Sequence, residues 1–195
     1  MILGSHNSWS YLRPKKWWMK LIAFTARCQS KTIREQYELG VRCFDLRIRF
    51  DKYGNTLFAH GIVEYDVDPD SVHEDLMWID NKGDCMVRVL HEARTEKQYS
   101  SCNISIFQDV CRGLQRKFEN TKFWCGRNLY NWHEDYDFGF YPTYEEKYAS
   151  VCSPKLVDDW WPWWFAKFNN KQILKDGSKA DVLLIDFVDI NSSKL

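Results

Sequence analysis

The order of apolar and polar positions along the chain alternates between strand-like and helix-like periods. Apolar and mostly charged side chains alternate over residues 41–50, which is typical of a β-strand. Apolar residues recur every three or four positions over 97–119, which predicts a helix with one buried face. The uninterrupted apolar run Val182–Ile185 predicts a strand buried on both faces, as in a parallel sheet covered by helices.

Further elements extend this alternation. We expect mostly helix over 16–38, a helix capped by Asp70 or Ser71, and a strand over 86–90. Alternating strands and helices indicate an α/β fold and favour a barrel over an open sheet. The chain has 195 residues, fewer than the roughly 250 usual for that barrel. We therefore expect one domain over residues 1–195, a compact TIM-type (β/α) barrel that is complete or lacks elements between 120 and 178.

Composition excludes several classes of protein. The chain is 45% hydrophobic and 16% aromatic with few Gly and Pro, which excludes a disordered protein. No apolar run approaches the roughly 20 residues of a membrane helix. Seven cysteines without a Cys-x-x-Cys pair match neither a disulfide framework nor a zinc site. Because polar sequence already starts at Gly4, we expect no signal peptide and a soluble, cytoplasmic protein, peripheral to a membrane or released by lysis.

Charge is zero overall but unevenly spread. Residues 1–50 hold ten Lys and Arg against three acidic residues. This excess predicts an anionic partner such as a phosphate or a membrane surface, although the charges could also simply solvate helix faces. The sequence has no Gly-rich phosphate loop, which argues against a nucleotide-binding fold. We expect no nucleic-acid partner, and the sequence does not predict an oligomeric state.

Two histidines follow predicted strands, where α/β barrels present catalytic side chains. His6 comes just after the first strand and His60 after the strand over 56–59. Between them, Asp45 and Arg47 share one face of a strand because they are two residues apart. Two imidazoles, a fixed cation and carboxylates are what in-line transfer at a phosphodiester requires when a neighbouring hydroxyl attacks. The set predicts a phosphodiesterase.

The order of these motifs is recognisable. Residues 3–8 (Leu-Gly-Ser-His-Asn-Ser), 40–47 and 58–61 (Phe-Ala-His-Gly) resemble the catalytic X region of phosphatidylinositol-specific phospholipase C. Residues 184–187 are similar to the last barrel strand of that family. The resemblance implies a barrel of the phospholipase-C-like phosphodiesterase type and cleavage of a phosphoinositide, or of another phosphodiester substrate.

Roles can be carried over by position, and they most resemble the bacterial, metal-independent branch. His6 would be the general base acting on the inositol 2-hydroxyl, giving a cyclic 1,2-phosphodiester. His60 would be the general acid that releases diacylglycerol. The resemblance further implies that Asp186 holds the base, that Asp45 supports the acid histidine, and that Arg47 replaces a metal.

The eukaryotic branch instead uses calcium, held by an asparagine, two strand acids and a later glutamate. Asn7 and Glu92 match that pattern, but Arg47 stands where the second acid would be. A guanidinium there supplies positive charge and removes an oxygen ligand. We therefore expect no cofactor and no metal. Asn7 still favours calcium binding, because it matches the asparagine ligand of the eukaryotic branch. His91, Glu92 and Arg94 are candidates, with Asn7, for substrate binding; surface ion pairs are the alternative.

Two aromatic clusters are candidates for membrane contact. Lys16, Trp17 and Trp18 form a basic, Trp-bearing stretch, as in proteins that rest on anionic lipid. The alternative is that both tryptophans pack on the outside of the barrel. The cluster Trp160–Trp164 is too aromatic to be wholly exposed, so we expect part of it in the core.

Two other functions compete with the phospholipase-C-like enzyme. One is a catalytically silent module that binds phosphoinositides or a protein. The other is a different phosphodiesterase on the same barrel, such as a glycerophosphodiesterase, which needs a metal and an early His-Arg-Gly motif that this sequence lacks. The two separate imidazoles favour the enzyme, because a binding module has little need for both.

Overall fold

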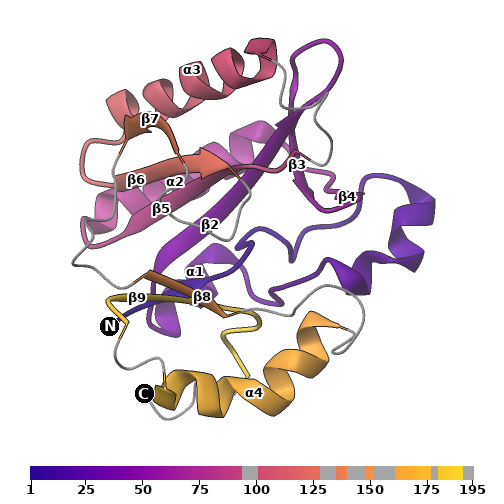
Figure 1. Ribbon diagram of the computed structural model, residues 1–195, viewed down its shortest axis with the longest axis vertical. Coiled ribbons are helices and arrows are strands. Elements are labelled where there is room, and N and C mark those ends of the chain that lie inside the picture. Colours follow the sequence, from indigo (N-terminus) through magenta and orange to yellow (C-terminus); the bar gives the residue numbers. More distant parts are fainter. Residues whose placement is uncertain (94–100, 128–134, 140–147, 152–160, 177–179, 191–195) are drawn as a thin grey trace.

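The structure is a computed structural model that describes residues 1–93, 101–127, 135–139, 148–151, 161–176 and 180–190, and a β-sheet runs through its middle (Figure 1). Hydrogen bonds join the strands in the order β7-β6-β5-β2-β1-β9-β8, and β3 and β4 continue from β2. The strands are β1 Ile2–Ser5, β2 Val41–Phe50, β3 Thr56–His60, β4 Val63–Glu64, β5 Met86–His91, β6 Lys122–Arg127, β7 Asp135–Gly139, β8 Tyr148–Val151 and β9 Val182–Ile185. The helices are the short 3-10 helices η1 Trp17–Leu21 and η2 Ala23–Thr25, then α1 Ile33–Glu38, α2 Pro69–Lys82, α3 Ser101–Lys117 and α4 Pro162–Asp176.

The central strands are parallel. β1 pairs in parallel with β2 and β9, β5 pairs in parallel with β2 and β6, and β8 with β9. β7 and β3 run antiparallel to their neighbours β6 and β2. The predicted mixed α/β fold is confirmed. The expected closed barrel is not, because within the described ranges no pairing joins β7 to β8 and closure requires the two end strands to pair.

β2 separates two environments. Its apolar alternate residues, including Phe44 and Ile48, belong to a large core with side chains of α2 and α3. Its other face carries Cys43, Asp45 and Arg47 in succession, because side chains alternate along a strand. A second apolar cluster adjoins that face and consists of Cys43, Met86, Leu90, Trp124, Val182 and Leu184. The carboxylate and the guanidinium therefore follow an apolar layer on the same side of the sheet.

Close packing of β1 against its neighbours depends on Gly4. It pairs with Cys43 on one side and Leu184 on the other. A Cβ at this position would collide with Cδ2 of Leu184. The missing side chain leaves room for the Leu184 side chain. The parallel pairing of β1 with β9 brings the segments that follow the two strands side by side.

Two helices, α2 and α3, lie where the sequence patterns predicted helices, but the residues at their ends differ from the predicted ones. α2 is capped by Asp68, whose side chain accepts from the Asp70 N–H, and begins at Pro69. The predicted cap at Asp70 or Ser71 is therefore two or three residues late, since proline suits the first helical position. α3 lies within the predicted range 97–119, of which residues 97–100 are outside the described residues.

The segment 16–38 is mostly helical as predicted, but it does not form one continuous helix. Two 3-10 helices and the short α1 replace it, with non-helical residues 26–32 between them. The N–H groups of Cys28 and Gln29 both donate to Ser10 Oγ at 2.9 Å, and Cys28 O accepts from Phe187 N–H at 2.6 Å. These tertiary hydrogen bonds use backbone groups that a continuous helix would have paired internally.

The region for which the sequence predicted no elements, residues 120–178, contributes β6, β7, β8 and α4. Asn170 of α4 is fully buried and donates to the carbonyls of Asp186 at 2.8 Å and Phe187 at 3.2 Å. The helix therefore supports the segment after β9. None of the helices in the described part is long and apolar enough to cross a bilayer.

Candidate active site

β1 ends in a tight turn that carries His6. The His6 N–H donates to Ile185 O at 2.9 Å, and the Ser8 N–H donates to Asp45 O at 2.9 Å. Between them Asn7 has a φ of 45°, in the left-handed region that asparagine adopts more readily than most residues. Its N–H donates to Asp45 Oδ2 at 2.9 Å. The turn is thereby tied to both neighbouring strands, which fixes the direction of the His6 side chain.

His6 and Asp186 form a buried pair. His6 Nδ1 lies 2.6 Å from Asp186 Oδ1, and Asp186 is fully buried directly after β9. A carboxylate acceptor fixes the tautomer with hydrogen on Nδ1 and leaves Nε2 able to accept a proton. The structure thus brings together the two residues that the sequence assigned to the general base and its support.

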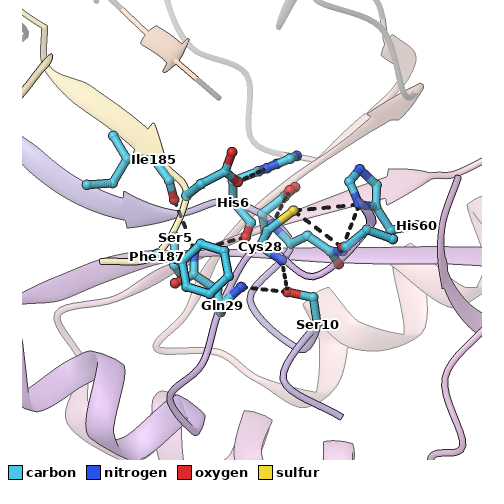
Figure 2. A network of polar contacts seen from close by, with 12 residues as sticks. Ser5, His6, Ser10, Cys28, Gln29, His60, Ile185 and Phe187 are labelled. Carbon is cyan, nitrogen blue, oxygen red and sulfur yellow. Dashed lines mark hydrogen bonds and ion pairs between the residues drawn. The ribbon is translucent and has the colours of Figure 1, made fainter. Parts of the chain in front are cut away.

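The His60 ring stands edge-on to the His6 ring (Figure 2). The ring centroids are 5.2 Å apart with an interplanar angle of 88°. His60 Nδ1 donates to Ala26 O at 2.9 Å and lies 3.6 Å from Cys28 Sγ. Burial, with the positive charge of Arg47, lowers the pKa of His60 to about 4. The expected support of His60 by Asp45 is wrong, because the backbone carbonyl of Ala26 holds the ring instead.

Arg47 is held between two carboxylates. Its Nε donates to Asp45 Oδ2 at 2.8 Å, and its Nη1 donates to Glu92 Oε2 at 3.1 Å. Glu92 Oε1 also accepts from the Gly61 N–H at 2.9 Å, directly after His60. Arg47, Asp45 and Glu92 are all buried. Burial opposes the charge on Arg47, but the two carboxylates outweigh it and raise its pKa above the ordinary value.

The low pKa of Asp45 makes the free energy of unfolding depend on pH. Burial by itself would raise the pKa of Asp45, but the charges of Arg47 and Arg88 lower it to about 2. A depressed carboxyl pKa stabilises the folded state above the unfolded value near 3.9, and this contribution disappears as the pH falls toward about 2. The ionised Asp45 carboxylate thus contributes about 2 kcal/mol to the free energy of unfolding.

We expect Asp45→Asn to abolish this acid dependence. In urea unfolding, the difference in unfolding free energy between the native protein and Asp45→Asn should shrink by about 2 kcal/mol between about pH 5 and pH 2. Asp109→Asn is the control, because Asp109 pairs with Arg112 at 3.0 Å on the exposed surface of α3. If the difference in unfolding free energy between the native protein and Asp45→Asn stays constant from about pH 5 to about pH 2, the pKa of Asp45 is not lowered in the folded protein.

The structure does not bring His91 to this site. Its ring is fully buried on the opposite face of β5, stacked on Phe107 at 5.2 Å and tilted against Phe50 at 5.5 Å. Arg94 lies outside the described residues. Of the residues expected to bind substrate, Glu92 and Asn7 therefore lie beside the histidines, although both are buried in hydrogen bonds.

Sequence reasoning missed three residues around the histidines. Arg88 is buried on β5 with Nη1 3.9 Å from Asp45 Oδ1, and a charge inside the apolar run 86–90 was a usable signal. Gln29 donates to the carbonyls of His6 and Ile185 at 3.1 and 3.0 Å. Cys28, beside it, contacts His60. Neither Gln29 nor Cys28 belongs to a pattern that the sequence reveals, because both act through contacts distant along the chain.

Comparison with known proteins gives a fold. No protein-family model matches the sequence, and no curated protein matches it. Among solved structures, phosphatidylinositol-specific phospholipase C from Listeria monocytogenes has a TM-score of 0.66 at 14% identity, covering 100% of this chain and 93% of that one. A double mutant of the Staphylococcus aureus enzyme has a TM-score of 0.66 at 13% identity, covering 95% and 84%.

A further S. aureus structure, titled for modulation of that enzyme's membrane binding, has a TM-score of 0.62 at 14% identity and covers 100% of this chain and 92% of that one. At such identities the likeness defines the fold. The chain has a mixed α/β fold. More narrowly, its fold is similar to that of bacterial phosphatidylinositol-specific phospholipases C.

Proposed function

We propose that the protein is a phosphodiesterase resembling phosphatidylinositol-specific phospholipase C. It cleaves a phosphoinositide by attack of the neighbouring inositol hydroxyl on phosphorus, giving a cyclic inositol phosphate and diacylglycerol. The observation that carries this proposal is the pair of imidazoles, 5.2 Å apart between centroids, each ring held by its own acceptor. Arg47, buried beside them, supplies the positive charge that the chemistry needs.

The reaction uses each group once. His6 takes the proton of the attacking hydroxyl on Nε2, and Asp186 stabilises the resulting imidazolium. The hydroxyl oxygen bonds to phosphorus while Arg47 stabilises the extra negative charge of the pentavalent species. The bond from phosphorus to the diacylglycerol oxygen breaks, and that oxygen takes a proton from His60.

Bound substrate should change the protonation of His60. Its low pKa, about 4, leaves the ring of the free protein mostly neutral near neutral pH. A phosphodiester anion beside the ring favours the charged form and raises that pKa. We expect the alkaline limb of kcat, which reports the complex, to lie at higher pH than that of kcat/KM, which reports the free protein. Coincident limbs in pH–rate profiles would contradict the role of His60.

Turnover, on this proposal, needs no metal. A calcium ion at this place would require oxygen ligands, and the carboxylates of Asp45 and Glu92 are already hydrogen-bonded to Arg47. The guanidinium also repels a divalent cation. Calcium does not fit these residues as they stand.

Phosphorus NMR tests the function directly. Phosphatidylinositol vesicles are incubated with the full chain in excess chelator, and the products are followed over time. A cyclic phosphate signal supports both the substrate and the internal attack. An acyclic inositol phosphate alone, or activity that the chelator abolishes, would count against the mechanism and favour a metal-dependent phosphodiesterase.

A patch of exposed apolar side chains supports contact with a lipid surface. Trp17 is 75% exposed on η1, which argues against packing of this residue on the protein exterior. Phe24 of η2 packs against Trp161 beside α4 at 4.9 Å, so the two regions adjoin (Figure 1). We call this patch the aromatic surface; its exposed members are Trp17, Trp18, Leu21, Phe24, Trp163, Trp164 and Phe168.

Cations accompany these rings. Lys167 Nζ lies 4.8 Å from the ring centroid of Trp163 and 5.3 Å from that of Trp164. Lys16 directly precedes η1, and Lys20 lies in its last turn. Aromatic rings with nearby lysines suit the boundary between headgroups and acyl chains of anionic lipid. Part of the cluster Trp160–Trp164 was expected in the core, and Pro162 is buried and Trp161 half-buried. Trp163 and Trp164 are exposed, and Trp160 lies outside the described residues.

We expect Trp17→Ala to weaken binding to vesicles of anionic phospholipid about tenfold, because an exposed indole is removed from the lipid contact. Sedimentation of the protein with vesicles measures this. Tyr53→Ala is the matched control, since Tyr53 is 76% exposed with Lys52 Nζ 4.7 Å from its ring centroid, in the turn between β2 and β3. Equal losses in both variants, or none in Trp17→Ala, would contradict this surface.

The thiols fit a reducing, cytoplasmic setting for this activity. Five cysteines in the described part are buried and form no disulfide: Cys28, Cys43, Cys85, Cys111 and Cys125. Free buried thiols are usual where the compartment keeps cysteines reduced.

A further inference from the structure

A third potential ligand stands beside the two histidines. His6, Cys28 and His60 come from separate segments, and each offers one nitrogen or sulfur atom such that all three atoms lie within 4.8 Å of one another (Figure 2). Cys28 is fully buried and His60 is half-buried, so the group reaches solvent on the His60 side. The proposed hydrolysis assigns no task to the thiol.

We propose that His6, Cys28 and His60 form a binding site for zinc, and that a bound zinc ion blocks turnover. The inhibitory part rests on the function proposed above; the metal site itself does not. Nitrogen and sulfur donors suit zinc, whereas calcium and magnesium take oxygen ligands.

The spacing is close to what zinc requires. Bonds of about 2.3 Å to sulfur and about 2.0–2.1 Å to nitrogen hold the ligand atoms of a tetrahedral site roughly 3.3–3.6 Å apart. Cys28 Sγ and His60 Nδ1 are already 3.6 Å apart. The widest separation, at most 4.8 Å, must close by about one ångström, which small side-chain rotations supply.

His6 is prepared for coordination by its partner. Its Nδ1 is engaged with Asp186 Oδ1 at 2.6 Å, which leaves Nε2 as the nitrogen that can bind a metal. A histidine that donates its other N–H to a carboxylate is the usual arrangement at zinc sites, because the carboxylate orients the ring and makes it more basic.

The other two ligands share an acceptor that can release them. The Ala26 carbonyl accepts from His60 Nδ1 at 2.9 Å, from Cys28 Sγ at 3.5 Å and from the Tyr65 hydroxyl at 3.0 Å. If zinc takes His60 and Cys28, the Tyr65 hydroxyl still satisfies this carbonyl. The Ala26 carbonyl oxygen therefore keeps a hydrogen-bond donor when zinc is bound.

Charge also permits the ion. Arg47 repels a divalent cation most strongly at its own carboxylate partners, and its ion pairs with Asp45 and Glu92 weaken that repulsion at the histidines and the thiol. When zinc binds, the Cys28 thiol loses its proton to solvent and the sulfur coordinates as thiolate, with no change of oxidation state. Zinc and thiolate together add one positive charge beside the Asp186 carboxylate.

The consequence for the reaction is direct. Zinc occupies Nε2 of His6, the atom that must take the proton of the attacking hydroxyl, and also holds the ring of His60. With three protein ligands the fourth position is open to water or to a phosphate oxygen. Zinc therefore competes with the acid–base chemistry rather than assisting it.

Cobalt(II) is the probe for the site, because a cobalt–thiolate bond gives a charge-transfer band in the near ultraviolet. The full chain is titrated with cobalt(II) without substrate, and zinc is then added to displace it. We expect a one-to-one band in the native protein and its loss in both Cys28→Ser and Cys28→Ala. Zinc affinity should fall by more than the roughly 10–100-fold that loss of an outer partner costs.

Cys85→Ser is the matched control, because Cys85 is also buried but donates to Asp84 Oδ1 at 3.3 Å at the start of β5. Asp186→Asn supplies a second variant that keeps the thiol, and it should weaken zinc binding about 10–100-fold. Absence of a band in the native protein, its persistence in both Cys28 variants, or its loss in Cys85→Ser would overturn the proposal.

A separate measurement tests the inhibition. Equimolar zinc should stop release of cyclic phosphate, and chelator should restore it, whereas Cys28→Ala should need at least tenfold more zinc. Turnover that continues at saturating zinc would overturn the inhibitory role. A protein that shows the cobalt band but never cleaves phosphatidylinositol would refute the proposed function and leave the metal site standing.

Discussion

His6→Asn should lower kcat by about 10²–10⁴, because it removes Nε2, the atom that on the proposed mechanism takes the proton of the attacking hydroxyl. Asparagine retains an N–H near the position of Nδ1, so the fully buried Asp186 carboxylate keeps a donor. The free energy of unfolding should therefore change by no more than about 1 kcal/mol. Initial rates of cyclic phosphate release and urea unfolding measure the two quantities separately.

His73→Ala is the control for this substitution. His73 lies on α2, half-buried, with its ring 5.4 Å from that of Phe118. It should retain full activity. Equal activity of His6→Asn and the native protein would remove the acid–base scheme. Tight phosphoinositide binding without cleavage, in both the native protein and His6→Asn, would instead indicate a binding module.

The sequence located the histidines because their positions follow from local patterns. His6 and His60 come at the ends of short strands, and the alternation over residues 41–50 places Asp45 and Arg47 on one face. Parallel pairing of β1 with β9 then brings Asp186 beside His6. The strand period alone places Asp45 and Arg47 on one face. The role of Asp186 came only from the resemblance to phosphatidylinositol-specific phospholipase C, because a hydrophobic pattern does not give the order of strands in a sheet.

His91 shows where that reasoning fails. It belongs to the same strand as Arg88 but lies an odd number of residues away, so the two side chains point to opposite faces. Arg88 reaches Asp45, and His91 packs on Phe107. Residue type alone favoured the histidine, whereas the alternation along β5 decides which residue faces the site.

The segment over residues 26–32 could not be predicted for a different reason. Its helical composition is overridden by contacts with residues far along the chain: Ser10 accepts from its N–H groups, and Phe187 donates to Cys28 O. The Ala26 carbonyl that holds His60 belongs to this segment. A single sequence contains no local signal for such contacts, because their partners are distant along the chain. Each tertiary hydrogen bond contributes more free energy than the differences in helix propensity between ordinary residues, so these bonds decide the conformation.

Arg47→Gln should cause the largest combined loss of stability and activity. It leaves Asp45 and Glu92 buried without the cation that pairs with both, which costs about 3–5 kcal/mol of unfolding free energy. Turnover should also fall by about 10²–10³, because the proposed mechanism uses this charge to stabilise the pentavalent phosphorus. Urea unfolding and initial rates, both measured well below the unfolding midpoint, report the two effects.

Arg42→Gln on the same strand separates the buried pair from an ordinary surface pair. Arg42 Nε donates to Asp84 Oδ2 at 2.8 Å, but both side chains are partly exposed. Its loss should cost at most about 1 kcal/mol and leave turnover unchanged. Stability losses of similar size in the two variants would show that Arg47 is not needed to compensate the buried carboxylates.

Acid should narrow the stability gap caused by Arg47→Gln. Without the guanidinium, the pKa of the buried Asp45 carboxyl rises, because burial then outweighs the remaining favourable charges. Protonation makes this carboxyl cheaper to bury, so the variant should lose less stability than the native protein as the pH falls from about 5 to about 3. The activity, in contrast, should not return, since protonating Asp45 does not replace the missing cation. Recovery of both together would mean that Arg47 serves only to neutralise its neighbours.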